Sequence, residues 1–382
     1  MRPSDAVLER AFLDDEVIAA GWSAAAAVAD HGVAIEAEHD SPHEALVAMV
    51  RMLGEQGLLS LMVGVPSWRA ICLARERLGY ASPLLELAFT MQGLGSFPIT
   101  LAGTESQKAR HLADVESGRA VAAFALTEPE AGSDLSQITT RAREDGDGWV
   151  LDGHKVLISN APVAERITVF AATKPPGERR RLSAFVVRGD APGLTRTATS
   201  VLGGHPIGEL RFEGVRVPAE DRLGGEGDGM RIALGTLHRF RPTVGAAAIG
   251  FAQRALDETV AHTTRRRQFG APLADLQAVR MGLAEMACGI EAGRLLVYRA
   301  AALADLGDGD REAEARAGSM AKLVATENAF AAIDRAVQLH GGRGVMTESM
   351  VARLYEDVRA LRIYEGASDV QKVLIARHLL AE

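Results

Sequence analysis

Cysteine is scarce in this sequence, and that scarcity excludes two kinds of site. Only two cysteines, Cys72 and Cys288, occur in 382 residues, and neither has a second cysteine or a histidine at metal-ligand spacing. A disulfide framework and a zinc site are therefore not expected, and no other metal site is predicted. Both cysteines are predicted to be buried apolar side chains.

Excess positive charge and long apolar runs are also missing. The net charge is −8, and the basic runs around Arg180 and Arg266 are only three residues long, so a general nucleic-acid surface is not expected. The longest uncharged run, residues 87–104, contains Gln92, Pro98 and three glycines and makes a poor membrane span. The N-terminus lacks the apolar core of a signal peptide. We expect a cytoplasmic protein that binds neither nucleic acid nor membrane.

The apolar pattern predicts three domains in the order helical, β, helical. Apolar residues recur at helical spacing over residues 1–120 and again over 225–382, whereas short β-branched segments bounded by turn residues occupy 121–224. A chain of 382 residues exceeds one ordinary core, so several domains are expected. No Gly-x-Gly-x-x-Gly stands between a strand and a helix, so a Rossmann fold has no support.

Local signals predict where some helices begin and end. Thr104 and Gln107 form a T-x-x-Q capping box that opens one helix. Gly341 stands where a glycine should end a long Ala-rich helix. Ser368 and Gln371 are predicted to form a second capping box, with Ser368 as the N-cap of the last helix.

The stretch RIYEGASDVQK, residues 362–372, places one acidic side chain, Glu365, in the connection before that last helix. Gly366 has no side chain, so another molecule can approach the backbone there. One interpretation is a solvated loop glutamate, which is the ordinary case. The other is a general base held where it can reach a substrate proton.

The stretch FALTEPEAGSD, residues 124–134, reads as a strand end that runs into a turn rich in backbone and hydroxyl donors. Such a nest could hold the polar edge of a cofactor. It could equally be an ordinary strand-to-loop turn with an aspartate cap. The turn chemistry alone leaves both interpretations open.

This stretch resembles the T-E-P-x-A-G-S-D signature of the acyl-CoA dehydrogenases. Further blocks resemble the family in its order and spacing: DGHKVLISN (152–160), RFRPTVGAAAIGFAQRALD (239–257), RRRQFGAPLADLQ (265–277), QLHGGRG (338–344) and IYEGASDVQ (363–371). The resemblance covers nearly the whole chain. It implies an α+β fold with an N-terminal helical domain, a middle β-barrel or sandwich domain, and a C-terminal four-helix bundle.

By position, the resemblance implies that Glu365 is the catalytic base of an α,β-dehydrogenation. In the family, this base takes the α-proton of an acyl thioester while the β-hydride passes to N5 of FAD. Hydrogen bonds to the thioester carbonyl stabilise the enolate-like charge. Exclusion of water by the acyl chain is expected to raise the pKa of Glu365 toward neutrality.

The resemblance also implies the residues that contact FAD and substrate. The flavin ring would be contacted by Phe124, Leu126, Thr127, Ser133, Leu157, Ser159, Ala367 and Asp369. The pyrophosphate and adenosine half would be contacted by Arg266, Gln268, Phe269, Gln277, Gln338, Gly341 and Gly342. Substrate contacts would come from Ser133, Arg241, Met91, Tyr364 and Gly366. In the family some FAD contacts come from a neighbouring subunit, which implies a homo-oligomer, a dimer or a tetramer.

Several of these residues also have simpler interpretations. Residues 265–267 could merely complement a helix C-terminus with positive charge, and Arg241 could be a surface helix charge. The bulk of Phe89, Thr90 and Met91 suggests a short, branched or compact acyl group if these residues form the floor of the acyl pocket. They could equally be core residues.

The sequence departs from the family near the flavin. Leu157 stands where the family usually has an aromatic residue, and Ala367 and Asp369 replace the commoner Thr and Gln or Glu. These changes leave open whether an electron-transfer flavoprotein reoxidises the flavin. They also leave open an oxidase, a dehydrogenase whose acyl group is held on a carrier protein, for which His238 at a CoA position is one argument, and a catalytically silent FAD-binding subunit.

Overall fold

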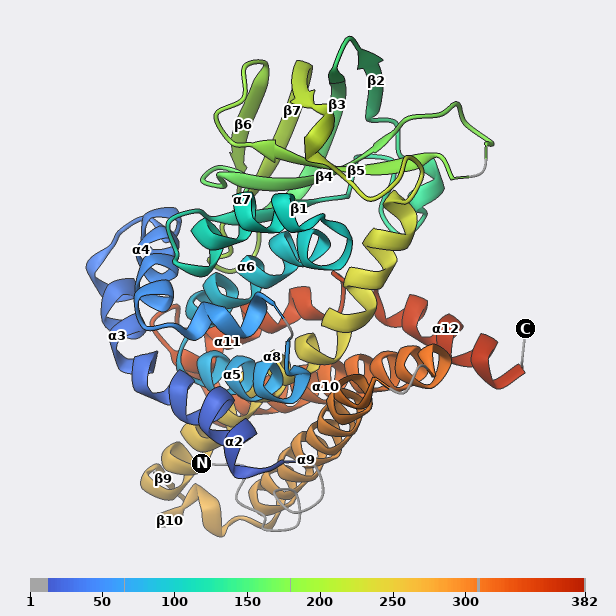
Figure 1. Ribbon diagram of the computed structural model, residues 1–382. Coiled ribbons are helices and arrows are strands. Elements are labelled where there is room, and N and C mark those ends of the chain that lie inside the picture. The colour runs from blue at the N-terminus through green and yellow to red at the C-terminus, as the bar shows by residue number, and fades with distance from the viewer. Residues whose placement is uncertain (1–12, 65, 179, 308–309, 381–382) are drawn as a thin grey trace. The chain divides into compact units, whose positions relative to one another are not determined.

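The computed structural model describes residues 13–64, 66–178, 180–307 and 310–380 of the protein. Figure 1 shows helical segments at both ends of the chain and a β segment between them. The helices before the β segment are α2 (Asp15–Ile18), the π-helical η1 (Ala19–Ser23), α3 (Ala24–Glu38), α4 (Pro42–Glu55), the 3₁₀ helix η2 (Leu58–Met62), α5 (Trp68–Ala81), α6 (Pro83–Ala102) and α7 (Glu105–Glu116).

The described residues of the β segment form eight strands and two short 3₁₀ turns. Its strands are β1 (Ala122–Ala125), β2 (Arg141–Asp145), β3 (Gly148–Ser159), β4 (Arg166–Ala172), β5 (Leu182–Arg188), β6 (Leu194–Thr199), β7 (Ile207–Pro218) and β8 (Arg222–Leu223). The turns are η3 (Leu135–Gln137) and η4 (Ala219–Asp221).

The helical part after the sheet begins with a long helix and a small hairpin. Its elements are α8 (Gly229–Arg265), β9 (Arg267–Gln268), β10 (Ala271–Pro272), η5 (Leu273–Asp275), α9 (Gln277–Leu306), α10 (Arg311–His340), η6 (Gly341–Val345), α11 (Met350–Leu361) and α12 (Ser368–Leu380). The predicted succession of helical, β and helical segments is thus confirmed.

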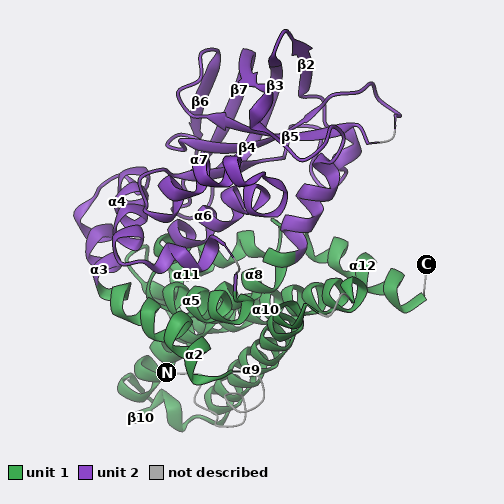
Figure 2. Ribbon diagram, in the orientation of Figure 1, with its two compact units in different colours: residues 1–30, 67–86, 239–382 green, residues 31–66, 87–238 purple. Residues whose placement is uncertain are grey.

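The chain divides into two compact units, which Figure 2 colours separately. Unit 1 comprises residues 1–30, 67–86 and 239–382, and unit 2 comprises residues 31–66 and 87–238. Neither unit is a continuous stretch, so residues far apart in sequence meet within each one. The predicted domain boundaries at 120/121 and 224/225 stay predictions.

Unit 2 is built on one mixed sheet whose strands follow the order β6-β7-β3-β2-β4-β5-β8, with β1 paired to β4. The pair β1–β4 is parallel, and the long pair β3–β7 is antiparallel. Buried apolar side chains such as Trp149, Phe185 and Phe212 fill its core. The strands β2 and β6 were not predicted, because the exposed, charged or threonine-rich residues in each dilute the apolar pattern.

Helix α6 approaches this sheet closely because it carries a glycine at the contact. A Cβ at Gly95 would lie 2.6 Å from the amide nitrogen of Ala123. The buried Gln92 donates to the Ala120 carbonyl (2.8 Å) and accepts from the Ala122 amide (2.8 Å). The uncharged part of α6, which the sequence made a poor membrane span, therefore uses its glutamine and glycine to dock against β1.

Unit 1 is a helical assembly in which small residues let long helices approach one another. A Cβ at Gly293 of α9 would lie 3.0 Å from Cα of Ala325 in α10, and one at Gly250 of α8 would lie 2.3 Å from the Glu76 carbonyl of α5. Glu76 itself is buried and bonds to Arg294 (3.0 Å) and to the Tyr298 hydroxyl (2.6 Å). This satisfied ionic cluster offsets the cost of removing its charges from water.

Two local predictions about helix ends are confirmed. Thr104 accepts from the Gln107 amide while the Gln107 side chain accepts from the Thr104 amide at 2.7 Å, which completes the capping box of α7. Gly341 follows α10 with φ 61°, a positive φ that glycine adopts readily.

Two others are wrong. The Gln371 amide donates to the Ala367 carbonyl, and the Ser368 hydroxyl bonds to Glu327, so Ser368 and Gln371 form no capping box. Cys72 is buried as predicted, but Cys288 is exposed. Cys288 lies at an exposed position of α9. A cysteine by itself does not indicate which face of a helix is exposed.

One helical stretch among the described residues, Asp15–Glu38, is long and apolar enough to cross a membrane. This finding rests on length and composition alone. A core helix of a water-soluble protein passes the same test.

Candidate active site

A tight loop between α11 and α12 holds Glu365. The amides of Ile363 and Tyr364 both bond back to the Ala360 carbonyl, and the Ser368 amide bonds to the Arg362 carbonyl at 3.1 Å. Glu365 has φ 52° and Gly366 has φ 92°, so two consecutive residues are left-handed. That conformation is ordinary for glycine and strained for glutamate, so the surrounding contacts must hold it.

The Glu365 carboxylate is partly removed from water and incompletely satisfied. Its Oε2 is inaccessible to solvent and has no hydrogen-bond partner among the described residues. Burial raises the pKa of Glu365 above its ordinary value of 4.5, against the attraction of Arg75, Lys322 and Arg241 and with a small push from Glu86. A carboxylate with an unpaired buried oxygen and a raised pKa is equipped to accept a proton.

The three cations come from three different helices of unit 1: Arg75 from α5, Arg241 from α8 and Lys322 from α10. Arg75 is fully buried and already paired, because its Nε lies 2.5 Å from Glu86 Oε1 and its Nη1 donates to the Thr243 hydroxyl. Arg241 is 5 % exposed, and its Nε has no partner. Burial lowers the pKa of Arg241, and the charge of Glu365 opposes that shift. Arg241 is therefore no surface charge.

The carbonyl of Gly366 is held from two sides. Lys322 Nζ donates to it at 2.7 Å and Gln371 Nε2 donates at 2.9 Å. Both side chains are fully buried. A Cβ at Gly366 would lie 2.3 Å from Gln371 Nε2 and 3.8 Å from Arg241 Nε. Because Gly366 has no side chain, the side chains of Gln371 and Arg241 can lie this close to its backbone.

The T-E-P stretch in unit 2 has a different organisation. Glu128 is buried and ion-paired with Lys155 of β3 at 2.8 Å, and it also accepts from the Thr139 and Thr140 amides. Burial opposes its ionisation, but the charge of Lys155 and these hydrogen bonds prevail and lower the pKa of Glu128 to about 2. Lys155 also donates to the Leu126 carbonyl at 2.9 Å. Glu128 therefore clamps the turn that carries Leu126 and Thr127.

Leu157 occupies a strained position at the end of β3. The pairing of β3 with β7 shifts register between Lys155 and Ile158, and Leu157 takes φ 54° with its side chain 55 % exposed. A bulge of this kind turns a side chain out of the ladder. Two residues on, the Ser159 hydroxyl lies 2.8 Å from Nε2 of His205, whose pKa burial lowers to about 4, so the imidazole is neutral at pH 7.

The other predicted contacts in unit 2 divide by exposure. Phe124 and Leu126 are nearly buried (8 % and 6 % exposed), Thr127 is half-buried and Ser133 is exposed. Phe89, Thr90 and Met91 are buried on α6, as both the pocket-floor and the core interpretations require. These residues belong to unit 2, whereas Glu365 belongs to unit 1.

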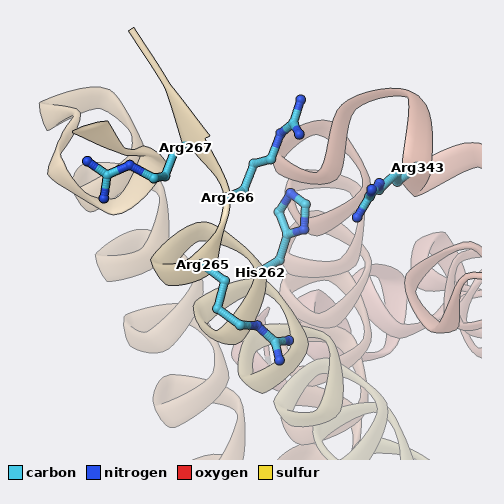
Figure 3. Close-up of a pocket in the computed structure, with 5 residues that line it drawn as sticks. All are labelled: His262, Arg265, Arg266, Arg267 and Arg343. Carbon is cyan, nitrogen blue, oxygen red and sulfur yellow. The ribbon is translucent and has the colours of Figure 1, made fainter. Parts of the chain in front are cut away.

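A basic pocket of about 430 Å³ lies where α8 ends, in unit 1. Its lining consists of His262, Arg265, Arg266, Arg267 and Arg343. In Figure 3 the side chains of His262, Arg266 and Arg343 lie toward one another, whereas Arg265 and Arg267 point away. No carboxylate of the described residues pairs with these arginines, and burial together with the neighbouring cations lowers the pKa of His262. Such a pocket suits a diphosphate.

The hairpin β9–β10 next to this pocket presents an aromatic side chain to solvent. Phe269 (φ 53°) and Gly270 (φ 82°) form its two-residue turn, and Phe269 is 91 % exposed. The remaining predicted FAD contacts of unit 1 are exposed except Ala367, which is half-buried: Gln268, Gln277, Gln338, Gly341, Gly342 and Asp369. Asp369 pairs with Lys372 at 2.9 Å.

Sequence reasoning missed Lys322, Gln371 as a side-chain donor, Arg75 and Glu86. Lys322 and Arg75 lie 43 and 290 positions before Glu365 in the chain, inside ordinary helical patterns. The available signal was a charge at an otherwise apolar helical position, as at Lys322 in AGSMAKLVATENAF, since such charges are seldom fully buried without a purpose.

The helical, β and helical segments and a loop carboxylate whose Oε2 has no partner among the described residues are the features to compare with known proteins. Three family models match the chain: Acyl-CoA dehydrogenase, N-terminal domain (residues 18–119), middle domain (123–215) and C-terminal domain (227–380). The chain belongs to the acyl-CoA dehydrogenase family and is an oxidoreductase. The predicted family and fold class are thereby confirmed.

Two curated relatives illustrate the similarity. The probable acyl-CoA dehydrogenase FadE25 of Mycobacterium tuberculosis is 36 % identical over 366 residues, which is 92 % of this chain and 91 % of the relative. The mitochondrial short-chain specific acyl-CoA dehydrogenase of Bos taurus is 38 % identical over 357 residues, which is 91 % of this chain and 85 % of the relative.

Solved structures agree. A glutaryl-coenzyme A dehydrogenase in complex with glutaryl-CoA matches with a TM-score of 0.88 and 32 % identity over 97 % of this chain and 96 % of that one. A Bacillus anthracis acyl-CoA dehydrogenase complexed with FAD matches with a TM-score of 0.84 and 29 % identity, over 94 % and 67 %. A chain from a study of the electron transferring flavoprotein of Acidaminococcus fermentans matches with a TM-score of 0.85 and 32 % identity, over 94 % and 98 %.

Proposed function

We propose that the protein dehydrogenates an acyl thioester between its α and β carbons, with Glu365 as the base. The observation that carries this proposal is the Glu365 carboxylate itself, whose buried Oε2 lacks a partner and whose pKa burial raises. FAD is the cofactor, and when bound it would supply the two-electron acceptor for the β-hydrogen. Glu365 would take the α-proton, and the thioester would leave oxidised to its enoyl form.

The chain's own residues prepare the proton transfer. The left-handed turn at Glu365 and Gly366 fixes where the carboxylate lies. The nearby cations Arg75, Arg241 and Lys322 favour the ionised form of the carboxylate, while burial raises its pKa and so makes it more basic. A base needs both effects, because a fully ionised but weakly basic carboxylate removes an α-proton poorly.

The basic pocket fits the diphosphate of FAD. Arg266 and Arg343 face each other across it with His262 beside them, and guanidinium groups bind phosphate oxygens through paired hydrogen bonds. We assign Arg266 to the FAD pyrophosphate, with Gln268, Phe269, Gln277 and the glycines at 341 and 342 as further contacts to the FAD of a neighbouring subunit.

The substrate is an acyl-CoA in this proposal, of short, branched or compact chain. Similarity to a short-chain specific acyl-CoA dehydrogenase and to a glutaryl-coenzyme A dehydrogenase supports this size class. The matched chain from the study of an electron transferring flavoprotein supports such a protein as electron acceptor. We also propose that the protein is cytoplasmic and forms a homo-oligomer.

The test is a Glu365→Gln variant. The purified variant should retain bound FAD and its folded state, because glutamine has the same shape, yet the flavin band near 450 nm, roughly where this cofactor class absorbs, should no longer bleach when acyl-CoAs are added without oxygen. The wild type should bleach with at least one member of a panel of short, branched, dicarboxylic and medium acyl-CoAs.

Glu356→Gln is the matched control, because Glu356 is an exposed glutamate of α11 nine positions earlier. It should bleach as the wild type does. Full reduction of Glu365→Gln by the same substrate would remove Glu365 from the role of base.

A further inference from the structure

Helix α10 holds the loop of Glu365 at three points. Glu327 pairs with Arg362 at the start of the loop (2.7 Å) and accepts from the Ser368 hydroxyl at its end (2.5 Å). Lys322, five positions earlier on the same helix, donates to the Gly366 carbonyl in the middle of the loop at 2.7 Å. The Glu327 carboxylate thus fixes both ends of the loop, and the Lys322 ammonium group fixes its centre.

Lys322 is an expensive residue to bury. Its side chain is fully buried, and no carboxylate of the described residues lies within ion-pair distance of it. An ammonium group removed from water without a counterion destabilises the folded protein. One backbone carbonyl offsets part of that cost, so stability alone does not explain a lysine at this position.

The charges facing Glu365 show what Lys322 adds. Arg75 from α5 is neutralised by Glu86 from α6, while Tyr364 on the loop is a neutral phenol because burial raises its pKa. Arg241 from α8 and Lys322 from α10 are the cations near Glu365 that have no acid of their own within ion-pair distance among the described residues. The attraction between Lys322 and Glu365 acts on both groups, and burial lowers the pKa of Lys322 to about 8.

We propose that Lys322 is a positioning residue for the base: through the Gly366 carbonyl it holds Glu365 in its left-handed turn, and through its charge it keeps the Glu365 carboxylate ionised. This inference rests on the proposed function. Lys322 acts on the substrate only by way of Glu365. At neutral pH the lysine is protonated, so both actions operate there.

Three substitutions separate the hydrogen bond from the charge. Lys322→Met removes both, Lys322→Gln keeps a donor and removes the charge, and Lys322→Arg keeps the charge in a different shape. The rate of flavin bleaching by an acyl-CoA that reduces the wild type is measured by stopped flow from pH 5 to 9 in each holoenzyme. Amide hydrogen exchange of residues 366–371 is measured in parallel.

The expected result is a shift of the acid limb, which is the low-pH part of the profile where the bleaching rate falls as the pH decreases. Loss of a nearby cation should raise the pKa of Glu365, so the pH below which bleaching slows should move up by about one unit in Lys322→Met and Lys322→Gln. That displacement makes bleaching roughly tenfold slower at any pH below the limb. Lys322→Arg should keep the limb of the wild type. Amide exchange of residues 366–371 should accelerate in Lys322→Met and stay nearly unchanged in Lys322→Gln.

Lys108→Met, a partly exposed surface substitution in an ion pair with Glu105, is the control for loss of one positive charge. It should leave the limb in place. An acid limb that is unmoved in Lys322→Met and Lys322→Gln would overturn the role of Lys322 while leaving Glu365 as base. A uniform loss of rate at every pH, with no displacement, would likewise mean that Lys322 is structural only.

Failure of the proposed function gives a different result, because then no acyl-CoA bleaches the wild type. Should Lys322→Met fail to fold, the comparison of Lys322→Gln with Lys322→Arg still decides, since only the loss of charge is expected to displace the limb.

Discussion

At the scale of single residues, the environment of Glu365 sets two effects against each other. Burial disfavours the ionised carboxylate, and three cations favour it, with the net result that the pKa is raised. The backbone adds a third constraint, because Glu365 takes φ 52° and Gly366 takes φ 92°. A glutamate in that conformation is held by its neighbours, so small changes beside it should alter catalysis before they alter the fold.

Gly366→Ala should therefore impair the base. Alanine pays about 1–2 kcal/mol to stay left-handed, and its Cβ would meet Gln371 Nε2 at 2.3 Å. We expect a folded protein that bleaches at least tenfold more slowly with acyl-CoA, because the turn relaxes and moves the carboxylate. The measurement is the stopped-flow bleaching rate together with the melting temperature.

Gly204→Ala is the matched control, since Gly204 has open space around it and no left-handed φ. Bleaching by Gly366→Ala at the rate of the control would contradict the idea that this turn positions the base.

At the scale of elements, a buried ion pair joins a turn to a strand in unit 2. Glu128 in the T-E-P turn and Lys155 in β3 are both buried and lie 2.8 Å apart. The glutamate of the signature thus acts through the fold of unit 2. It pairs with Lys155, which donates to the Leu126 carbonyl, and the next residue of β3 donates to the Thr127 carbonyl. Leu126 and Thr127 are two of the residues that the family resemblance assigns to the flavin.

Glu128→Gln should destabilise the protein by about 3–5 kcal/mol, because it leaves the Lys155 ammonium buried without its counterion. The ionised Glu128 also has a pKa lowered to about 2 in the folded state, so its contribution to the free energy of unfolding is present above about pH 4.5 and is lost as the pH falls through about 2. Urea unfolding at pH 7 and at pH 3 measures both effects.

Glu130→Gln is the control, since Glu130 is exposed in the same turn. It should unfold with the wild type. A Glu128→Gln variant as stable as Glu130→Gln at pH 7 would show that the clamp contributes nothing to the fold.

At the scale of the whole molecule, unit 1 presents an exposed apolar side chain next to a basic pocket. Phe269 is 91 % exposed at the tip of its hairpin, and the arginines of the neighbouring pocket have no carboxylate partner among the described residues. A large exposed aromatic beside unpaired cations is typical of an interface with a partner and an anionic ligand.

Phe269→Ser should accordingly weaken the proposed oligomer and its hold on FAD. We expect light scattering to show a smaller assembly at micromolar concentration, and the ratio of flavin absorbance to protein to fall severalfold after gel filtration. Leu202→Ser, which changes another exposed apolar side chain (60 % exposed) in unit 2, should change neither quantity. A wild type that is monomeric with full FAD would contradict the assignment.

The sequence by itself determined the family, the order of helical, β and helical segments, and the cofactor. It also placed Glu365 in the connection before the last helix. These features depend on local periodicity and on contiguous motifs such as T-E-P-E-A-G-S-D. It also predicted the cap of α7, since a capping box lies within four residues. It mispredicted the start of α12, where Gln371 turns inward to hold Gly366 in place of capping the helix.

Only the tertiary structure decided what surrounds Glu365. Arg75, Glu86, Arg241 and Lys322 reach Glu365 from four helices that are distant in sequence. Burial and charge proximity depend on how helices pack against one another, and helical periodicity records only that a position faces inward. Lys322 could therefore be read in the sequence as a charged residue, but its contact with the Gly366 carbonyl depends on the packing of α10 beside the Glu365 loop.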